Sequence, residues 1–172
     1  MASLASPLQR VVRALARVCL LALVGLLFLG MAAKIPVTVR FFVEANAQDT
    51  DRFAAPIAFR NPPRRAFIEK FPTIHERLIR AIYPFQAADG SWGCAFKLNE
   101  SGRLDLEVLS TNMRGRSIVA FVGTKTGTHQ VIDMQIDKPI RDGIINIPYG
   151  LTELEVAALT HEFAIIGQKK KK

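Results

Sequence analysis

Short apolar segments separated by turn signals fill the second half of the chain, and this pattern restricts the fold more than any other feature of the sequence. Residues 78–85 and 92–98 have strand length and flank Asp89 and Gly90, a dipeptide typical of tight hairpin turns because both residue types tolerate positive φ. Further strands are predicted at residues 117–122, 131–136 and 144–148. Because most connections between these segments are short, we expect antiparallel pairing.

Two helices are predicted among these strands. The first runs to about Met113 and is capped by Asn99 or Ser101, since both residue types accept hydrogen bonds from free N–H groups at a helix start. Its buried side is expected to carry Leu104, Val108 and Leu109. Thr152 and Glu155 have capping-box spacing and open the second helix. The order β-α-β-β-β-α from residue 92 predicts an α+β fold with both helices on one face of an antiparallel sheet.

Residues 18–33 contain no charged or strongly polar side chain. A helix of this length measures about 24 Å, and flanking apolar residues extend it toward the roughly 30 Å of a bilayer core. We therefore predict a transmembrane helix over residues 14–36. Arg10, Arg13 and Arg17 precede the run, so the positive-inside rule predicts a cytoplasmic N-terminus and an exported body. A cleaved signal peptide and a mitochondrial presequence remain alternatives, because both combine basic residues with such a pattern.

The formal net charge of +8 comes from the two ends of the chain, because Lys and Arg balance Asp and Glu between residues 35 and 168. Nucleic-acid binding requires concentrated positive charge, so this class of function is excluded for the body. The two cysteines, Cys19 and Cys94, and the three histidines are widely separated, so we expect no disulfide, metal site or cofactor. No phosphate loop or nucleophile elbow is found, and a catalytic role is not expected.

The first part of the body combines a strand pattern with proline-rich sequence. Residues 37–44 alternate apolar and polar side chains, which predicts a half-buried strand. Four prolines then interrupt residues 45–73, which predicts an irregular arm. Phenylalanines gather here and indicate either core packing or a partner-binding surface, because aromatic and Arg side chains supply much of the energy at interfaces. The candidate partner-binding residues are Phe53, Phe59, Arg60, Arg64, Arg65, Phe67 and Phe71.

From Phe96 to Phe163 the chain resembles the head of the periplasmic domain of the SecD/SecDF family, the membrane-embedded accessory proteins of the Sec translocase. The resemblance rests on the sequences FKLNE at 96–100, LSTNMRG at 109–115, IVAFV at 118–122 and GLTELE at 150–155. It implies a ferredoxin-like, extracytoplasmic domain that contacts another polypeptide. Proton-driven translocation is not carried over, because the charged multi-helix membrane bundle of the family has no counterpart among these residues.

The predicted fold class is α+β, with an N-terminal transmembrane helix followed by an antiparallel-sheet, ferredoxin-like α/β sandwich. The predicted segments are a cytoplasmic N-terminus (1–13), the transmembrane helix (14–36), a strand with an irregular Pro/Phe-rich arm (37–85), the SecD-head-like domain (86–167) and a lysine tail (168–172).

The predicted function is that of a non-catalytic, single-span accessory or scaffold subunit of the inner membrane, whose periplasmic domain docks on a larger membrane complex. The alternatives are a soluble exported binding domain that carries a signal peptide, a Sec-translocase-associated preprotein-binding factor and an enzyme with an unrecognised site. The expected partners are other subunits of that complex and membrane lipid, without nucleic acid or a small-molecule substrate.

Overall fold

The structure is a computed structural model that describes residues 37–46, 48–49 and 52–168. They belong to the second of two compact units, Ile35–Lys172. The predicted cytoplasmic segment, the predicted transmembrane helix and the four lysines from residue 169 lie outside the described residues. Within the described ranges, no helix is both long and apolar enough to cross a membrane. The predicted transmembrane helix is therefore not part of the fold described below.

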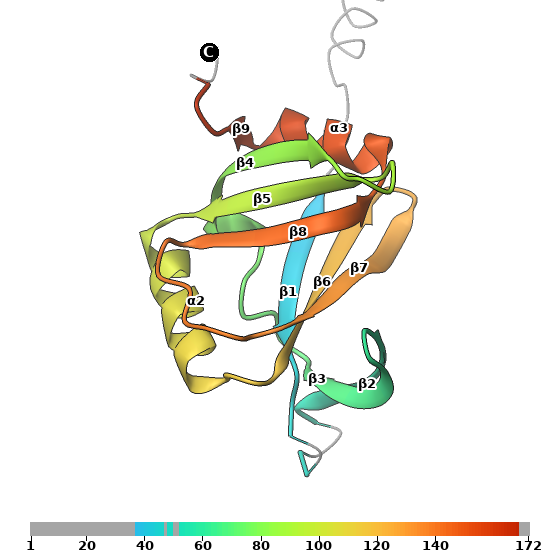
Figure 1. Cartoon of the computed structure of the whole chain (residues 1–172), viewed down its shortest axis with the longest axis vertical. Coiled ribbons are helices and arrows are strands. Elements are labelled where there is room, and N and C mark those ends of the chain that lie inside the picture. Colours follow the sequence, from blue (N-terminus) through green and yellow to red (C-terminus); the bar gives the residue numbers. More distant parts are fainter. Residues whose placement is uncertain (1–36, 47, 50–51, 169–172) are drawn as a thin grey trace, which may run out of the picture. The chain divides into compact units, whose positions relative to one another are not determined.

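Strands account for most of the regular structure of the described residues, and they form two larger sheets and a separate hairpin (Figure 1). One sheet has the order β8-β5-β4-β9, with bounds Ile144–Leu151, Trp92–Leu98, Ile79–Gln86 and Ala164–Ile165. The other has the order β1-β6-β7, with bounds Thr38–Val43, Ser117–Thr124 and Gly127–Gln135. The hairpin consists of β2 (Ala54–Arg60) and β3 (Pro63–Glu69). All strand pairs are antiparallel except β4 with β9.

The main core lies between the two larger sheets. Phe41 on β1 and Phe96 on β5 belong to different sheets, are both almost fully buried and meet edge to face with ring centroids 5.8 Å apart. Figure 1 shows β4, β5 and β8 crossing in front of β1, β6 and β7. The predicted α+β sandwich, with helices on one face of a single ferredoxin-like sheet, is therefore wrong. Strand β1 causes the difference, because it pairs with β6 and completes a second sheet with its own apolar face.

The helices occupy the margins of the sheets. Helix α2 (Glu100–Asn112) is capped by Asn99, whose side chain accepts the N–H of Gly102 at 2.9 Å. Helix α3 (Glu153–Glu162) begins with the capping box that the sequence predicts, and a short 3-10 helix, η1 (Glu76–Leu78), precedes β4. The predicted buried side of α2 is wrong in two positions, because Leu104 and Val108 are 48% and 58% exposed. The buried residues of α2 are Gly102, Leu106, Leu109 and Ser110.

The proline-rich arm is more regular than the sequence predicts, because residues 54–69 form the hairpin β2–β3. Prolines are tolerated at the first residue of a strand and in edge strands, where no ladder N–H is lost. Pro63 is the first residue of β3, and Pro56 lies in β2, which has only one strand neighbour. Pro63 therefore marks the start of β3, and neither proline prevents the hairpin from forming.

Candidate docking surface on the hairpin β2–β3

The hairpin has one face turned toward the domain and one turned away, as the period of two along each strand requires. On the inner face, Phe59 and Ile68 are buried against Val119 of β6, so that β6 is covered on both sides. Partly buried apolar residues complete this second cluster: Phe42, Ala55, Ile57, Ala66 and Phe121. The hairpin is therefore packed on the domain through its own small core.

A buried carboxylate fixes the turn of the hairpin. Asp133 on β7 is 5% exposed, and its Oδ2 accepts the backbone N–H groups of Arg60 at 3.1 Å and of Asn61 at 2.8 Å. Its Oδ1 accepts the Nε2 group of Gln130 at 3.4 Å. These donors compensate the burial of the charge, which without them would be costly. The tip of the hairpin is thus held against β7.

A second polar contact holds the facing strand. The guanidinium of Arg64 donates to both carboxylate oxygens of Glu44, at 2.7 Å for Oε2, and the N–H of Ser117 also donates to Oε2 at 3.0 Å. These bonds, led by the one from Arg64, lower the pKa of Glu44, and the same contact raises the pKa of Arg64. The Arg64 guanidinium also lies 4.4 Å from the ring centroid of Phe59. Arg64 and Phe59 therefore position the hairpin on the domain.

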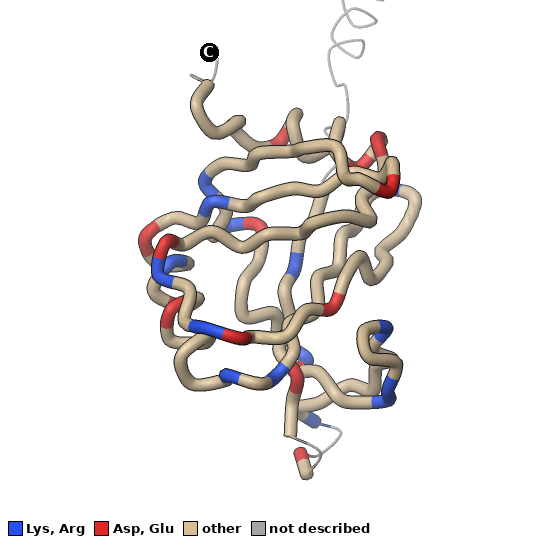
Figure 2. The backbone as a smooth tube through the Cα atoms, in the orientation of Figure 1, with Lys and Arg blue, Asp and Glu red and all other residues tan. Residues whose placement is uncertain are grey.

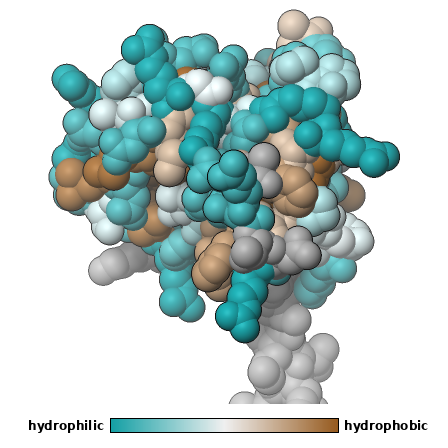
Figure 3. Space-filling model, turned by 90° about the horizontal axis from the view of Figure 1, so that it is seen from below, coloured by the Kyte–Doolittle hydropathy of each residue, from teal (hydrophilic) through white to brown (hydrophobic). Residues whose placement is uncertain are grey.

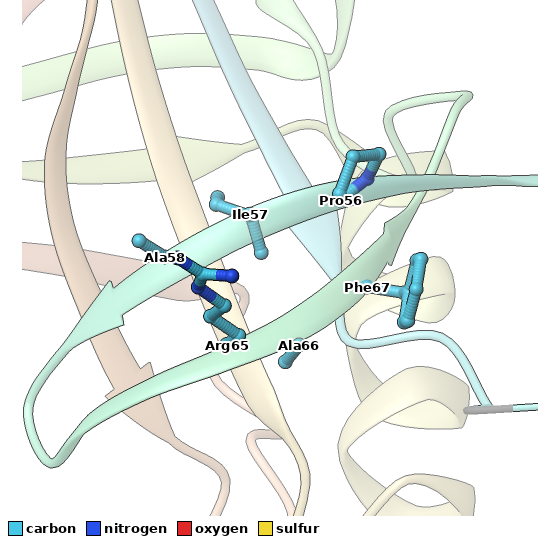
Figure 4. Close-up of a pocket in the computed structure, with 6 residues that line it drawn as sticks. All are labelled: Pro56, Ile57, Ala58, Arg65, Ala66 and Phe67. Carbon is cyan, nitrogen blue, oxygen red and sulfur yellow. The ribbon is translucent and has the colours of Figure 1, made fainter.

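The outer face of the hairpin carries the side chains that do not pack on the domain. Pro56, Ala58, Arg65 and Phe67 share it by register, because Pro56 pairs with Phe67 and Ala58 with Arg65. Together with Ile57 and Ala66 they line a shallow depression. Figure 4 shows the Arg65 side chain reaching across the hairpin toward Ala58, with the Phe67 ring farther along β3. We name this depression with its neighbour Arg60 the outer hairpin face.

Two exposed rings lie at the open end of the hairpin. Phe53 is 65% exposed and Phe71 is 76% exposed, and the N–H of Lys70 donates to the carbonyl of Phe53 at 2.9 Å. This bond brings the two chain ends together, so both rings lie at the same end. Seen from below, hydrophobic areas of the surface are divided by hydrophilic side chains (Figure 3).

The structure thus separates the predicted partner-binding residues into two groups. Phe59 is buried against the domain, and Arg64 is paired with Glu44 while its side chain stays 39% exposed. The other five face outward or lie at the open end: Phe53, Arg60, Arg65, Phe67 and Phe71. No hydrogen bond or ion pair joins the guanidinium groups of Arg60 and Arg65 to another of the described residues.

A second open surface was not found from the sequence. Tyr83 and Phe85 on β4 lie with near-parallel rings, centroids 6.5 Å apart, and Tyr83 is 54% exposed. Strands β4 and β5 each carry one charged residue near an end, Arg80 and Lys97, and β8 carries none (Figure 2). The period of two in residues 78–85 was the available signal, since it separates these rings from the buried Ile82.

Little in the described residues points to chemistry. No group of three or more His, Cys, Asp or Glu within them is arranged to hold a metal ion. Burial raises the pKa of Cys94 to about 12, which keeps its thiol protonated and unreactive. His129 contacts the buried Glu155 at 3.2 Å, but that carboxylate is already engaged by Thr152 in the cap of α3.

The class of fold is a pair of crossed, mainly antiparallel sheets with helices at their margins and a docked hairpin. Among solved structures, one of a membrane component, SecDF, that enhances protein export has a TM-score of 0.51 and 11% identity, covering 81% of this chain and 70% of that one. SecDF in a super-membrane-facing form has a TM-score of 0.49 and 12% identity, covering 77% of this chain and 20% of that one. No family model and no curated protein matches the chain.

At 11% identity the first similarity shows the fold alone, which is that of a SecD-like periplasmic domain. The predicted resemblance to the SecD head is confirmed to that extent. The prediction also placed this domain on a single-span membrane protein, and the predicted span lies outside the described residues.

Proposed function

We propose that this protein is a non-catalytic accessory subunit whose described domain lies on the periplasmic side of the inner membrane and docks on another polypeptide of a membrane complex. The outer hairpin face supplies the contact. Phe53 and Phe71 extend it at the open end of the hairpin. Aromatic and arginine side chains are the residue types that most often anchor protein interfaces.

The observation that carries this proposal is the unequal use of the hairpin's side chains. Phe59, Arg64 and Asp133 hold the hairpin rigidly on the domain, so it needs no partner in order to fold. The side chains of Arg65 and Phe67, both on β3, belong neither to the apolar cluster nor to the polar contacts that hold the hairpin. A fixed element that presents unpaired cationic and aromatic groups is pre-organised for binding, because little ordering entropy remains to be lost.

A second candidate function is the binding of preproteins at the Sec translocase. The SecD-like fold favours it, because a structure with that fold belongs to a protein described as enhancing protein export. The two candidates differ in the partner, which is a folded subunit in the first and an unfolded chain in the second. Site-specific photocrosslinking from residue 67 in cells distinguishes them. A single discrete adduct supports the subunit, whereas a ladder that requires ongoing secretion supports preproteins.

Co-purification from membranes in mild detergent tests the docking proposal. The tagged full chain with Arg65→Glu and Phe67→Ala should lose its co-migrating partner, whereas a control with Lys125→Glu and Leu154→Ala should retain it. The control removes one exposed cation and one exposed apolar side chain elsewhere on the domain, since Lys125 is exposed and Leu154 is 78% exposed. Retention of the partner by the hairpin variant contradicts the proposal.

A fusion experiment tests the localisation. A reporter that is active only outside the cytoplasm, attached after Gln168, should be active, and a reporter that is active only inside should be silent. The opposite result contradicts the periplasmic location. Recovery of the native chain in the membrane fraction after osmotic lysis is also expected, and its complete release would argue for the soluble exported alternative.

A further inference from the structure

The charges of the hairpin are compensated on one face and uncompensated on the other. On the inner side, Arg64 is matched by Glu44, and Asp133 is matched by backbone donors. Arg60 and Arg65 remain without a hydrogen-bonding or ionic partner among the described residues. Two neighbouring guanidinium groups favour an anionic ligand group, and a carboxylate suits them because a guanidinium can bind it in a bidentate manner.

Apolar groups follow the arginines in a fixed order along the hairpin. Arg60 pairs with Pro63 at the turn, Ala58 with Arg65 comes next, and Pro56 with Phe67 follows. Two residues along a strand span about 7 Å, which is also the spacing between alternate side chains of an extended peptide. A bound extended segment could therefore place one carboxylate on Arg65 and one apolar side chain on Phe67 only if the two lie two positions apart.

An acid at the open end sets the direction of such a segment. Glu69 follows Phe67 on the same face by alternation, and it lines a groove with Thr73 and Leu109 of α2. Partial burial raises the pKa of Glu69, against the lowering effect of the nearby charge of Arg116. A carboxylate of the ligand is therefore attracted to the arginines near the turn, whereas Glu69, farther along β3, offers it no positive charge.

The shape of this face favours a polypeptide over a lipid surface. The apolar and cationic groups follow one another along the strands and border a depression, whereas a helix or loop that binds bilayers presents a protruding apolar group ringed by cations at one depth. The edge of β2 is also poorly suited to strand addition. Pro56 has no N–H, and the N–H of Arg60 is already bound to Asp133. Recognition must therefore come from side chains.

We infer that the outer hairpin face binds an extended polypeptide segment in which an acidic side chain and a large apolar side chain alternate two positions apart. This inference rests on the proposed function, because it specifies the partner chemistry of the same surface. It excludes basic segments, and it excludes segments of the same composition whose acidic and apolar side chains project to opposite sides.

Fluorescence anisotropy with labelled peptides and the purified full chain tests the inference. The first peptide repeats the unit Glu-Ser-Leu-Ser, which places both side chains on one side of an extended chain. A second replaces Glu by Lys, and a third repeats Glu-Leu-Ser-Ser, which has the same composition with the two side chains on opposite sides. We expect affinity about tenfold weaker for the second peptide and several-fold weaker for the third.

A charge swap supplies the matched control. The variant Arg60→Glu with Arg65→Glu should prefer the Lys peptide over the Glu peptide, while Lys125→Glu should keep the preference of the unmodified chain. Both arginines are exposed, so thermal unfolding of the double variant should match that of the unmodified chain. Binding of the unmodified chain and of the double variant to anionic phosphatidylglycerol vesicles, compared with phosphatidylcholine vesicles, tests the alternative of a lipid surface.

Equal affinity for the Glu and Lys peptides, or for the two orders of Glu and Leu, overturns the inference. Arginine-dependent binding to the anionic vesicles without discrimination among peptides also overturns it, in favour of a lipid surface. If the hairpin variant loses its co-purifying partner while the peptides are not discriminated, the inference alone fails. If that variant keeps its partner, the proposed function fails.

Discussion

Asn61 donates its backbone N–H to Oδ2 of Asp133 at 2.8 Å, although the two residues are 72 positions apart in the sequence. The neighbouring N–H of Arg60 donates to the same oxygen. One buried carboxylate on β7 therefore holds the turn of a hairpin that is formed much earlier in the chain. Docking of the hairpin depends on this side chain as well as on the apolar cluster beneath it.

Asp133→Ala should destabilise the domain by about 2 kcal/mol, because it leaves two backbone donors unpaired in a partly buried place. Urea denaturation measures the loss, and hydrogen exchange at Arg60 and Asn61 should accelerate more than exchange in β5. Asp137→Ala, at an exposed position two residues after β7, serves as the control and should change stability little. Unchanged exchange at the turn in Asp133→Ala would show that the apolar cluster alone holds the hairpin.

Two phenylalanines of the predicted docking set should respond in opposite ways to truncation. Phe59→Ala should cost about 3 kcal/mol, because Phe59 is 3% exposed and packs on Ile68 and Val119. Phe71→Ala should change stability by less than about 0.5 kcal/mol, because Phe71 is 76% exposed. In co-purification, Phe71→Ala should weaken partner binding without a change in melting temperature. Equal destabilisation by both variants would contradict the burial of Phe59 in the hairpin and the exposure of Phe71 beyond its open end.

Features determined by neighbouring residues were predictable from the sequence. Asp89 and Gly90 form the predicted turn, with Gly90 at a φ of 83° and the Asp89 side chain accepting the N–H of Ser91. The Thr152 capping box and the Asn99 cap are confirmed as well, because a cap joins groups only a few residues apart. Strand β5 has the bounds predicted for the strand that returns after the turn at Gly90, Trp92–Leu98.

Features determined by distant pairing were not predictable. Strand β1 pairs with β6, with Phe41 opposite Ala120, and nothing in the local pattern of either strand selects this partner. The single-sheet fold was wrong for that reason. Phe59 and Phe67 lie on opposite faces of the hairpin because the register of β2 with β3 decides which side chains face β6. The positions of the phenylalanines in the sequence do not reveal this register. The set of docking residues could therefore be predicted only in part.

Acidification should remove the contribution of the Glu44–Arg64 contact to stability. The pKa of Glu44 lies below its ordinary value of 4.5, chiefly because Arg64 donates to its carboxylate. A carboxylate with a lowered folded-state pKa stabilises the fold above its unfolded-state pKa, and this stabilisation disappears as the pH falls through the folded-state value. The unfolding free energy of the native chain should therefore approach that of Glu44→Gln below pH 4.5.

The native chain must be compared with Glu44→Gln because Glu69 changes the unfolding free energy in the opposite direction on acidification. Burial raises the pKa of Glu69, so protonation of this group adds stability on acidification. Glu69 is present in both chains and cancels in their difference. Urea denaturation across the acidic range measures that difference, and a gap that stays constant from neutral to low pH would contradict the assignment to Glu44.

Gly93→Ala should disrupt the open aromatic surface of the β8-β5-β4-β9 sheet. A Cβ at this position would lie 2.5 Å from ring atoms of Phe85 and 2.5 Å from the carbonyl oxygen of Pro148. The ring can rotate away, but the carbonyl belongs to β8, the strand next to β5 in the sheet, and must move with its backbone. We expect a loss of stability of about 2 kcal/mol, typical of overpacking in a well-packed position.

A double-mutant cycle with Phe85→Ala separates the two contacts, since Phe85→Ala should relieve only the part due to the ring. Complete relief by Phe85→Ala would show that the approach of β8 imposes no constraint, and no loss in Gly93→Ala would show that neither the ring nor the carbonyl constrains this position.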